Sequence, residues 1–205
     1  MLSHLRPAVS VIALFTLLTG AALPTLFTEF GKLAFPFQAG GSLIEKSGHV
    51  VGSALLGQNF TSAKYFAARP SALMGADPKD SSKQVATPYD ASESGASNLA
   101  PTSKALIDRV TADVAKMGPA PVPADAVTTS ASGLDPDISP ENALRQVARV
   151  AAARGLPANT VRALVAQHTS GLELGVLGAP RVRVLQLNIA LDAIPGQTKV
   201  AAAGN

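Results

Sequence analysis

The residues that could carry out chemistry are few in this chain, and their types exclude several kinds of site. The sequence contains no cysteine, which excludes a thiolate metal site, an iron–sulfur cluster and a cysteine nucleophile. The three histidines, His4, His49 and His168, are far apart, so we expect no metal site. No Gly-x-Ser-x-Gly sequence occurs, and no spacing supports a catalytic triad. We therefore expect a protein that is not an enzyme.

Stretches rich in glycine or aspartate also fall short of known binding loops. Residues 52–57 begin and end with glycine, but Gln58 and Asn59 follow where a phosphate-binding loop needs a lysine and a hydroxyl residue. Asp135-Pro136-Asp137 lacks the glycine and the distal glutamate of a calcium loop, so we interpret it as a turn before a helix. Three later glycines lack the spacing of a dinucleotide fingerprint and are interpreted as turns: Gly171, Gly175 and Gly178.

Hydroxyl side chains are concentrated in residues 128–137, where four of them precede Gly133: Thr128, Thr129, Ser130 and Ser132. In one interpretation they bind local backbone groups, and Gly133 makes a left-handed turn. In the other, the loop contacts another protein or binds a nucleotide. Hydroxyls without a lysine or a phosphate-binding loop hold a triphosphate poorly, so we favour local structure combined with a protein contact.

The composition argues against nucleic acid as a partner. Lysine and arginine number 17 against 14 acidic residues, a net charge of only +3, and no tryptophan is present to stack on bases. The mean hydropathy of +0.24 is high for a soluble chain. An excess of apolar residues must therefore lie somewhere in the sequence.

That excess lies at the N-terminus. No charged residue occurs between Arg6 and Glu29. As a helix, residues 7–28 would rise about 33 Å, enough to cross a hydrocarbon core of about 30 Å. The alternative is a cleaved signal peptide, but the apolar core of such a leader is shorter, at about 7–15 residues. We therefore predict an uncleaved transmembrane helix.

The charges around this span predict its orientation. Arg6 precedes it without an accompanying acidic residue, so the N-terminal stub should stay cytoplasmic and the rest of the chain should be extracytoplasmic. Small residues within the span offer a packing face for a partner helix: Ser10, Ala13, Gly20, Ala21 and Ala22. The predicted organisation is a stub (1–6), a transmembrane helix (7–28), a single mixed α+β extracytoplasmic domain (33–195) and a flexible tail (196–205).

Local patterns predict the elements of the α+β domain. Apolar runs at 40–44 and 49–56 flank a turn and indicate a β-hairpin. Residues 67–102 are dense in serine, proline, glycine and aspartate and predict a long irregular segment. Residues 103–117 show an amphipathic helical face made of Leu106, Val110, Val114 and Met117.

The C-terminal third predicts a pair of helices and a mixed element. Ser139-Pro140-Glu141 starts a helix that Gly155 ends. Its core face is expected to contain Leu144, Val147, Ala148 and Ala151. A second helix follows with a stripe of Val161, Leu164, Val165 and a half-buried His168. Residues 181–192 fit both a strand and a helix, and we favour a short strand that turns into a helix.

Several stretches are distinctive enough to resemble a known family. They are 52–60 (GSALLGQNF), 65–72 (YFAARPSA), 89–91 (YDA), 94–99 (SGASNL), 122–136 (VPADAVTTSASGLDP), 138–140 (ISP) and 149–156 (RVAAARGL). Together with the single N-terminal span, they resemble the KdpC family, the C subunits of bacterial Kdp potassium-transporting P-type ATPases. The resemblance runs from about the anchor to residue 192.

The resemblance implies a non-catalytic accessory subunit of a high-affinity ATP-driven potassium uptake complex in the bacterial inner membrane. Its partners would be a channel-like potassium-binding subunit, a P-type ATPase subunit and a small fourth subunit. The family is described as a catalytic chaperone that raises the ATP affinity of the ATPase subunit. Its serine/glycine run has been likened to an ABC signature loop, which would place nucleotide at Ser130, Ser132 and Gly133.

Three functions therefore compete. The first is an anchored accessory subunit that binds no cofactor itself, with ATP acting through the partner ATPase subunit. The second is a secreted soluble hydrolase with a cleaved leader. The third is a nucleotide-affinity subunit whose domain faces the cytoplasm.

Overall fold

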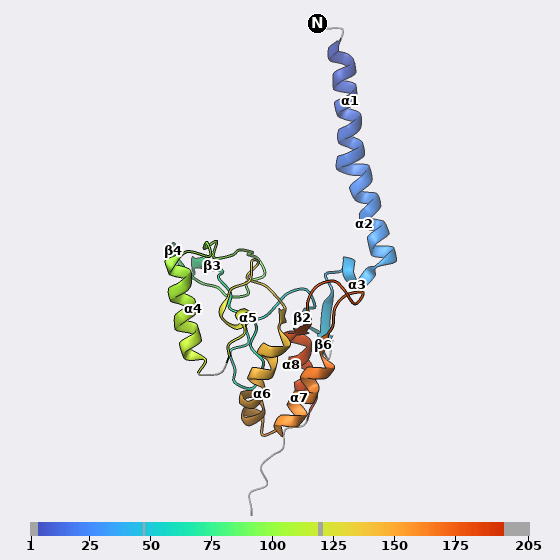
Figure 1. Cartoon of the computed structure of the whole chain (residues 1–205). Coiled ribbons are helices and arrows are strands. Elements are labelled where there is room, and N and C mark those ends of the chain that lie inside the picture. The colour runs from blue at the N-terminus through green and yellow to red at the C-terminus, as the bar shows by residue number, and fades with distance from the viewer. Residues whose placement is uncertain (1–3, 47, 119–120, 195–205) are drawn as a thin grey trace, which may run out of the picture. The chain divides into compact units, whose positions relative to one another are not determined.

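The computed structural model describes residues 4–46, 48–118 and 121–194 (Figure 1). The predicted tail, 196–205, lies outside the described residues, as does the start of the stub. The chain divides into two compact units, Met1–Ser53 and Ala54–Asn205. The structure confirms the predicted fold class, because a long apolar N-terminal helix is followed by a mixture of helices and small sheets.

The first unit is dominated by one helix of 30 residues, Leu5–Ala34, which is long and apolar enough to cross a membrane (Figure 1). It consists of α1 (Leu5–Leu17), a π-helical turn η2 (Leu18–Ala22) and α2 (Leu23–Ala34). None of the described side chains in these three elements is buried. The helix thus extends past both ends of the predicted span, 7–28.

The π-helical turn has a local cause in Pro24. A proline inside a helix lacks the N–H that would bind the carbonyl four residues earlier, here that of Gly20, and its ring crowds that carbonyl. The wider turn at η2 directly precedes this position and relieves the crowding. Thr19 also donates a hydrogen bond from its hydroxyl to the Phe15 carbonyl at 2.7 Å.

The helix breaks at Phe35, where the backbone leaves helical geometry (φ −138°, ψ 59°). A single turn, α3 (Pro36–Ala39), precedes the antiparallel strands β1 (Leu43–Lys46) and β2 (His49–Ser53). The predicted hairpin is confirmed, and its strands pair Lys46 with His49. Its strands group with the N-terminal helix in the first unit.

The second unit begins with a correction. The segment predicted to be irregular contains a hairpin of β3 (Met74–Asp77) and β4 (Asp80–Ala86). The sequences of these strands do not alternate between apolar and polar residues, and no described residue of either strand is buried. The hairpin turns at Asp77, whose carboxylate accepts a hydrogen bond from the Lys79 N–H at 2.8 Å.

The predicted helix at 103–117 is confirmed as α4 (Lys104–Lys116). Its predicted amphipathic face is only partly covered, because Val114 is 38% exposed and Met117 is 37% exposed. After it, a single turn, α5 (Ala124–Val127), leads into the 128–137 loop.

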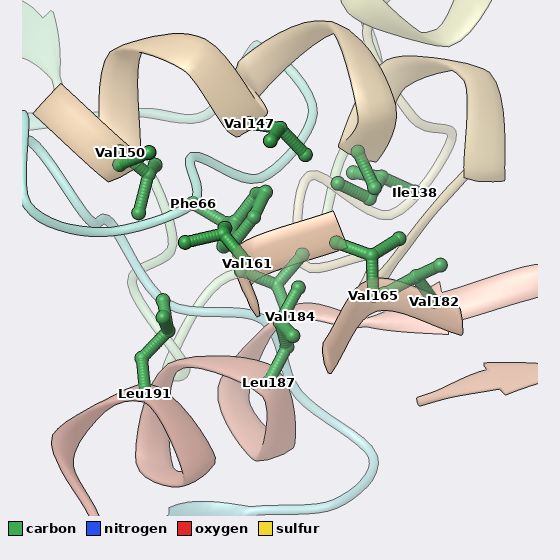
Figure 2. Close-up of a cluster of buried hydrophobic side chains, with 12 residues drawn as sticks. Phe66, Ile138, Val147, Val150, Val161, Val165, Val182, Val184, Leu187 and Leu191 are labelled. Atoms are coloured by element: carbon green, nitrogen blue, oxygen red, sulfur yellow. The ribbon is translucent and has the colours of Figure 1, made fainter. Parts of the chain in front are cut away.

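The core of the second unit forms between α6 (Pro140–Arg154), α7 (Ala158–Gln167) and α8 (Val184–Asp192), with a small antiparallel sheet in the order β5–β7–β6. The strands are β5 (Asp137–Ile138), β7 (Arg181–Arg183) and β6 (Thr169–Ser170). Figure 2 shows Phe66, from the segment between β2 and β3, among apolar side chains of these helices and strands: Ile138, Val147, Val150, Val161, Val165, Val182, Val184, Leu187 and Leu191.

The ends of α6 are confirmed, but its predicted core face is partly wrong. The Ser139 hydroxyl accepts a hydrogen bond from the Asn142 N–H, and Gly155 is left-handed (φ 66°). Leu144 and Ala148 are exposed, whereas Ala143 and Val150 are buried in their place. Since α6 is rich in alanine and valine, its apolar pattern fits two faces, and packing on the other elements selects one.

The remaining C-terminal predictions are confirmed. Val161 and Val165 of α7 are buried, and His168 is half-buried at its end. The ambiguous segment is a strand, β7, that continues directly into α8. The Val184 N–H at this junction donates to the Pro136 carbonyl at 3.0 Å, which fixes the junction against the 128–137 loop.

Candidate functional site

The 128–137 loop is held by its own hydroxyl groups. The Ser130 Oγ accepts a hydrogen bond from the Gly133 N–H at 2.9 Å, and the Ser132 Oγ accepts one from the Leu134 N–H at 3.1 Å. The Thr128 hydroxyl donates to the Ala124 carbonyl at 2.7 Å. Ser130 is only 5% exposed. These are the local backbone bonds that the sequence predicted for a structural loop.

Gly133 holds the tightest position of the loop. Its φ of +71° is left-handed, and a Cβ atom built there would lie 2.5 Å from Leu73 Cγ. Its carbonyl accepts a hydrogen bond from the Ser71 hydroxyl at 2.8 Å. A residue without a side chain is therefore required by both the backbone angle and the packing.

Arg69 ties the loop to the preceding segment. Its guanidinium forms an ion pair with Asp135 at 2.9 Å and reaches the carbonyls of Thr128 and Thr129 at 3.4 and 3.5 Å. The Tyr89 hydroxyl donates to the Arg69 carbonyl at 2.7 Å. Burial raises the pKa of Tyr89 to about 12, and the Asp135 charge adds to the effect. Tyr89 therefore stays a neutral hydrogen-bond donor at physiological pH.

Asp125 joins the two ends of the loop. Its carboxylate accepts hydrogen bonds from the Ser139 N–H and hydroxyl, each at 2.8 Å, and from the Asn142 side chain at 3.0 Å. Burial raises the pKa of Asp125, but these hydrogen bonds outweigh that effect and hold the pKa below its ordinary value. The charged carboxylate thus fixes α5, which precedes the loop, to the start of α6, which follows it.

Asp137, at the loop's end, lies between two arginines. Its carboxylate is 3.4 Å from the Arg181 Nε and 4.0 Å from the Arg183 Nε. Burial raises the pKa of Asp137, although Arg183 opposes the shift. Asp135 accepts from the Asp137 N–H at 3.0 Å, as expected for a turn. Among the residues that the structure describes, no group of three His, Cys, Asp or Glu side chains could hold a metal ion.

Segments far apart in sequence meet at this loop. The Gly57 N–H donates to the Leu134 carbonyl at 2.8 Å, and the Gly95 N–H donates to the Ser132 carbonyl at 3.0 Å. A Cβ atom at Gly57 would lie 2.4 Å from the Tyr89 ring and 2.5 Å from the Asp135 carbonyl. The stretches that carry the family resemblance thus form one connected network. Sequence reasoning named Ser130, Ser132 and Gly133 but gave no role to the residues that brace them.

The residues that hold the 128–137 loop in place, Arg69, Tyr89 and Asp125, are hard to identify from sequence. Arg69 and Tyr89 stand in quoted stretches, yet nothing in their spacing predicts that one backbone carbonyl joins them. Asp125 has no clearer signal, because its partners Ser139 and Asn142 lie 14 and 17 positions later in the sequence.

The other predicted site residues belong to the first unit. Ser10 and Ala13 lie on α1, and Gly20, Ala21 and Ala22 lie in the π-helical turn. All five are exposed, and nothing lies within 4 Å of a Cβ built at Gly20. The structure therefore places them on one membrane-capable helix with room for a partner.

Comparison with known proteins identifies the family. The chain matches the family "KdpC: K+-transporting ATPase, c chain" over residues 5–193. It is 58% identical to the potassium-transporting ATPase KdpC subunit of Rhodopseudomonas palustris (strain BisB18) over 197 residues, which cover 94% of this chain and 99% of the relative. The KdpC subunit of Methylobacterium nodulans is 54% identical over 96% of this chain and 100% of its own length.

The match extends through the membrane-capable helix, the 128–137 loop and the helical core. It contradicts the alternative of a secreted hydrolase. The chain therefore belongs to the KdpC family and is a non-catalytic subunit of a K+-transporting ATPase.

Proposed function

We propose that this chain is a membrane-anchored accessory subunit that stabilises a high-affinity, ATP-driven potassium uptake complex. Its partners are a channel-like potassium-binding subunit, a P-type ATPase subunit and a small fourth subunit. The observation that carries the proposal is the helix Leu5–Ala34, whose described side chains are all left unburied by the rest of the chain. Such a helix needs lipid and partner helices to cover it.

The small residues of the helix are the proposed contact with a partner helix. In water-free surroundings helices associate through close packing, which small side chains allow. Gly20→Leu fills the space above the π-helical turn and should weaken co-purification of the complex in mild detergent from potassium-starved cells. Val11→Leu is the matched control, because Val11 lies about 180° around the helix from Gly20. Equal recovery of both variants would contradict this contact.

We propose a cytoplasmic stub at residues 1–6, a membrane span at 7–28 and an extracytoplasmic domain at 33–195. Arg6 before the span supports this orientation. Because the chain has no cysteine, Ser82→Cys on the exposed strand β4 gives a single reporter for a membrane-impermeant thiol reagent. It should react in cells with a permeable outer layer, whereas His4→Cys should react only after lysis. The reverse pattern would invert the topology.

We further propose that the chain raises the ATP affinity of the ATPase subunit as a catalytic chaperone, acting through subunit contact. The support is that both Ser130 and Ser132 already accept main-chain hydrogen bonds, and that Arg69 is paired with Asp135. Nucleotide photolabelling of the assembled complex should therefore mark the ATPase subunit. Labelling of this chain that the Ser130→Ala, Ser132→Ala double variant abolishes would instead favour direct ATP binding at Ser130, Ser132 and Gly133.

A further inference from the structure

Phenylalanine is distributed unevenly along the chain. Four of the seven phenylalanines fall within eleven residues, at the point where the apolar helix ends. We define the phenylalanine collar as Phe27, Phe30, Leu33, Phe35 and Phe37. Its members are between 54% and 85% exposed, so the chain itself does not cover them. Soluble proteins rarely leave such a contiguous apolar surface in water.

The last turns of α2 are amphipathic. At 100° per residue, the collar members Phe27, Phe30 and Leu33 fall within an arc of about 120°. The opposite side carries Glu29 and Lys32, which form an ion pair at 2.8 Å. The apolar surface of the membrane helix therefore continues along one side, beyond the point where charged residues first appear. A helix leaving a bilayer at an angle has this pattern, with one side in lipid and the other in water.

The chain then bends instead of leaving the surface. The helix breaks at Phe35, and α3 presents Phe37, which is 54% exposed. Several backbone groups of this bend are hydrogen-bonded within the chain: the Phe35 N–H donates to the Gly31 carbonyl at 2.8 Å, and the carbonyls of Phe35, Pro36 and Phe37 each accept an N–H at 2.9 Å. Backbone polar groups that are satisfied internally can enter a weakly polar layer at little cost.

From these observations we infer that the phenylalanine collar lies in the headgroup–acyl boundary of the bilayer and acts as a second, interfacial anchor beside the membrane span. The inference rests on the proposed membrane placement of Leu5–Ala34. The occupant is lipid because Phe27, Phe30 and Leu33 continue the apolar surface of that helix, and Phe35 and Phe37 follow directly where the helix ends. Phenylalanine and leucine are typical of the apolar face of helices that lie in this boundary, and a buried depth of roughly 5–10 Å is typical of such interfacial segments.

The absence of tryptophan from the sequence allows a direct test. Full-length Phe37→Trp is placed in vesicles of phosphatidylcholine and phosphatidylglycerol that contain lipids brominated at shallow or deep acyl positions. Its emission should shift to the blue and be quenched more by the shallow bromines than by the deep ones. Phe30→Trp provides a second collar position in case the substitution at Phe37 perturbs the bend.

Two reference variants separate this inference from the membrane placement itself. Leu14→Trp, within the span, should be quenched more by the deep bromines. Ile107→Trp on α4 has the same 54% exposure as Phe37 and should respond only to an aqueous quencher. If the Leu14 variant is quenched while both collar variants are not, the collar proposal is overturned and the span stands. If none of the three is quenched, the membrane placement fails as well.

A partner protein is the remaining occupant to test. The same measurement on the co-purified complex should retain the shallow quenching of the Phe37→Trp variant. Loss of that quenching on assembly, with the Leu14→Trp signal unchanged, would show that protein covers the collar and would overturn the proposal.

Discussion

The two units of this chain reach stable structure in opposite ways. In the first, the buried residues among those described are two serines, Ser42 and Ser53, and its long helix has no buried side chain. In the second, twelve buried apolar residues form one core. The long helix of the first unit therefore follows from local propensity rather than from burial within the chain. The second is defined by contacts between residues far apart in the chain.

Asn188 illustrates what the second unit adds. Its side chain accepts a hydrogen bond from the Phe66 N–H at 2.9 Å and donates one to the Phe66 carbonyl at 3.0 Å, across 122 positions of sequence. It is only 2% exposed. A buried amide satisfied on both sides fixes one arrangement of the core, because any slip leaves both groups unpaired. The described part of the first unit relies on short-range contacts instead, such as that of Thr19 with Phe15.

The largest expected effect on stability comes from truncating one phenylalanine in each unit and comparing the two variants. Phe66 is 0% exposed and Phe30 is 58% exposed. Phe66→Ala leaves a cavity and should lower the free energy of unfolding of the second unit by about 3–5 kcal/mol. Phe30→Ala should leave the melting temperature unchanged in detergent. Calorimetry of the full chain measures both, and similar losses for the two variants would break the distinction.

The sequence predicted those elements whose start and end depend on neighbouring residues. The membrane helix, the Ser139 and Gly155 ends of α6, and the β7–α8 junction each follow from nearby residues. The β3–β4 hairpin was missed because its strands have no apolar alternation. The core face of α6 was partly misassigned because Ala143, Leu144 and Ala148 are all apolar, and only tertiary packing distinguishes them.

The candidate site shows the same limit. Ser130, Ser132 and Gly133 were found because hydroxyls and glycine signal a tight loop. The residues that support them were missed because Arg69 lies 66 positions before Asp135, and no local pattern predicts such a pairing. The hydrogen bonds within the loop are short-range, whereas those that hold it in place are not.

Two glycine-to-alanine substitutions, Gly133→Ala in the 128–137 loop and Gly20→Ala in the long helix, compare the packing of the two units. Gly133→Ala forces a left-handed φ on alanine and places its Cβ against Leu73, so it should cost about 2–4 kcal/mol. Gly20→Ala lies in an open helical position and should leave the stability of the second unit unchanged. Thermal unfolding of the two variants gives the comparison directly. A neutral Gly133→Ala would mean that the loop rearranges at little cost.

The loop hydroxyls should give a smaller effect. Ser130→Ala with Ser132→Ala removes two acceptors of main-chain N–H groups, and the expected loss is about 1–3 kcal/mol. Each kcal/mol lost lowers the melting temperature by about 2–4 °C, a shift that calorimetry measures. Ser10→Ala, on the exposed helix, is the control and should have no effect. Loss of pump activity without any change in melting temperature would instead assign the serines to a partner or nucleotide contact.

The smallest expected effect depends on pH and concerns Asp125. Because the folded state holds its pKa below the ordinary value of 3.8, the ionised carboxylate adds stability above that pH, and this contribution is lost as the pH falls through the folded pKa. Asp125→Asn keeps the shape but presents an amide donor to Ser139 and Asn142, so it should cost about 1 kcal/mol near pH 7. In acid the difference from the parent chain should shrink, since the parent carboxyl is then neutral too. Glu29→Gln in the first unit is the control and should leave the stability of the second unit unchanged, because its pair with Lys32 is more than half exposed. Melting temperatures between pH 3 and 8 test this, and a pH-independent difference for Asp125→Asn would assign the loss to packing rather than to charge.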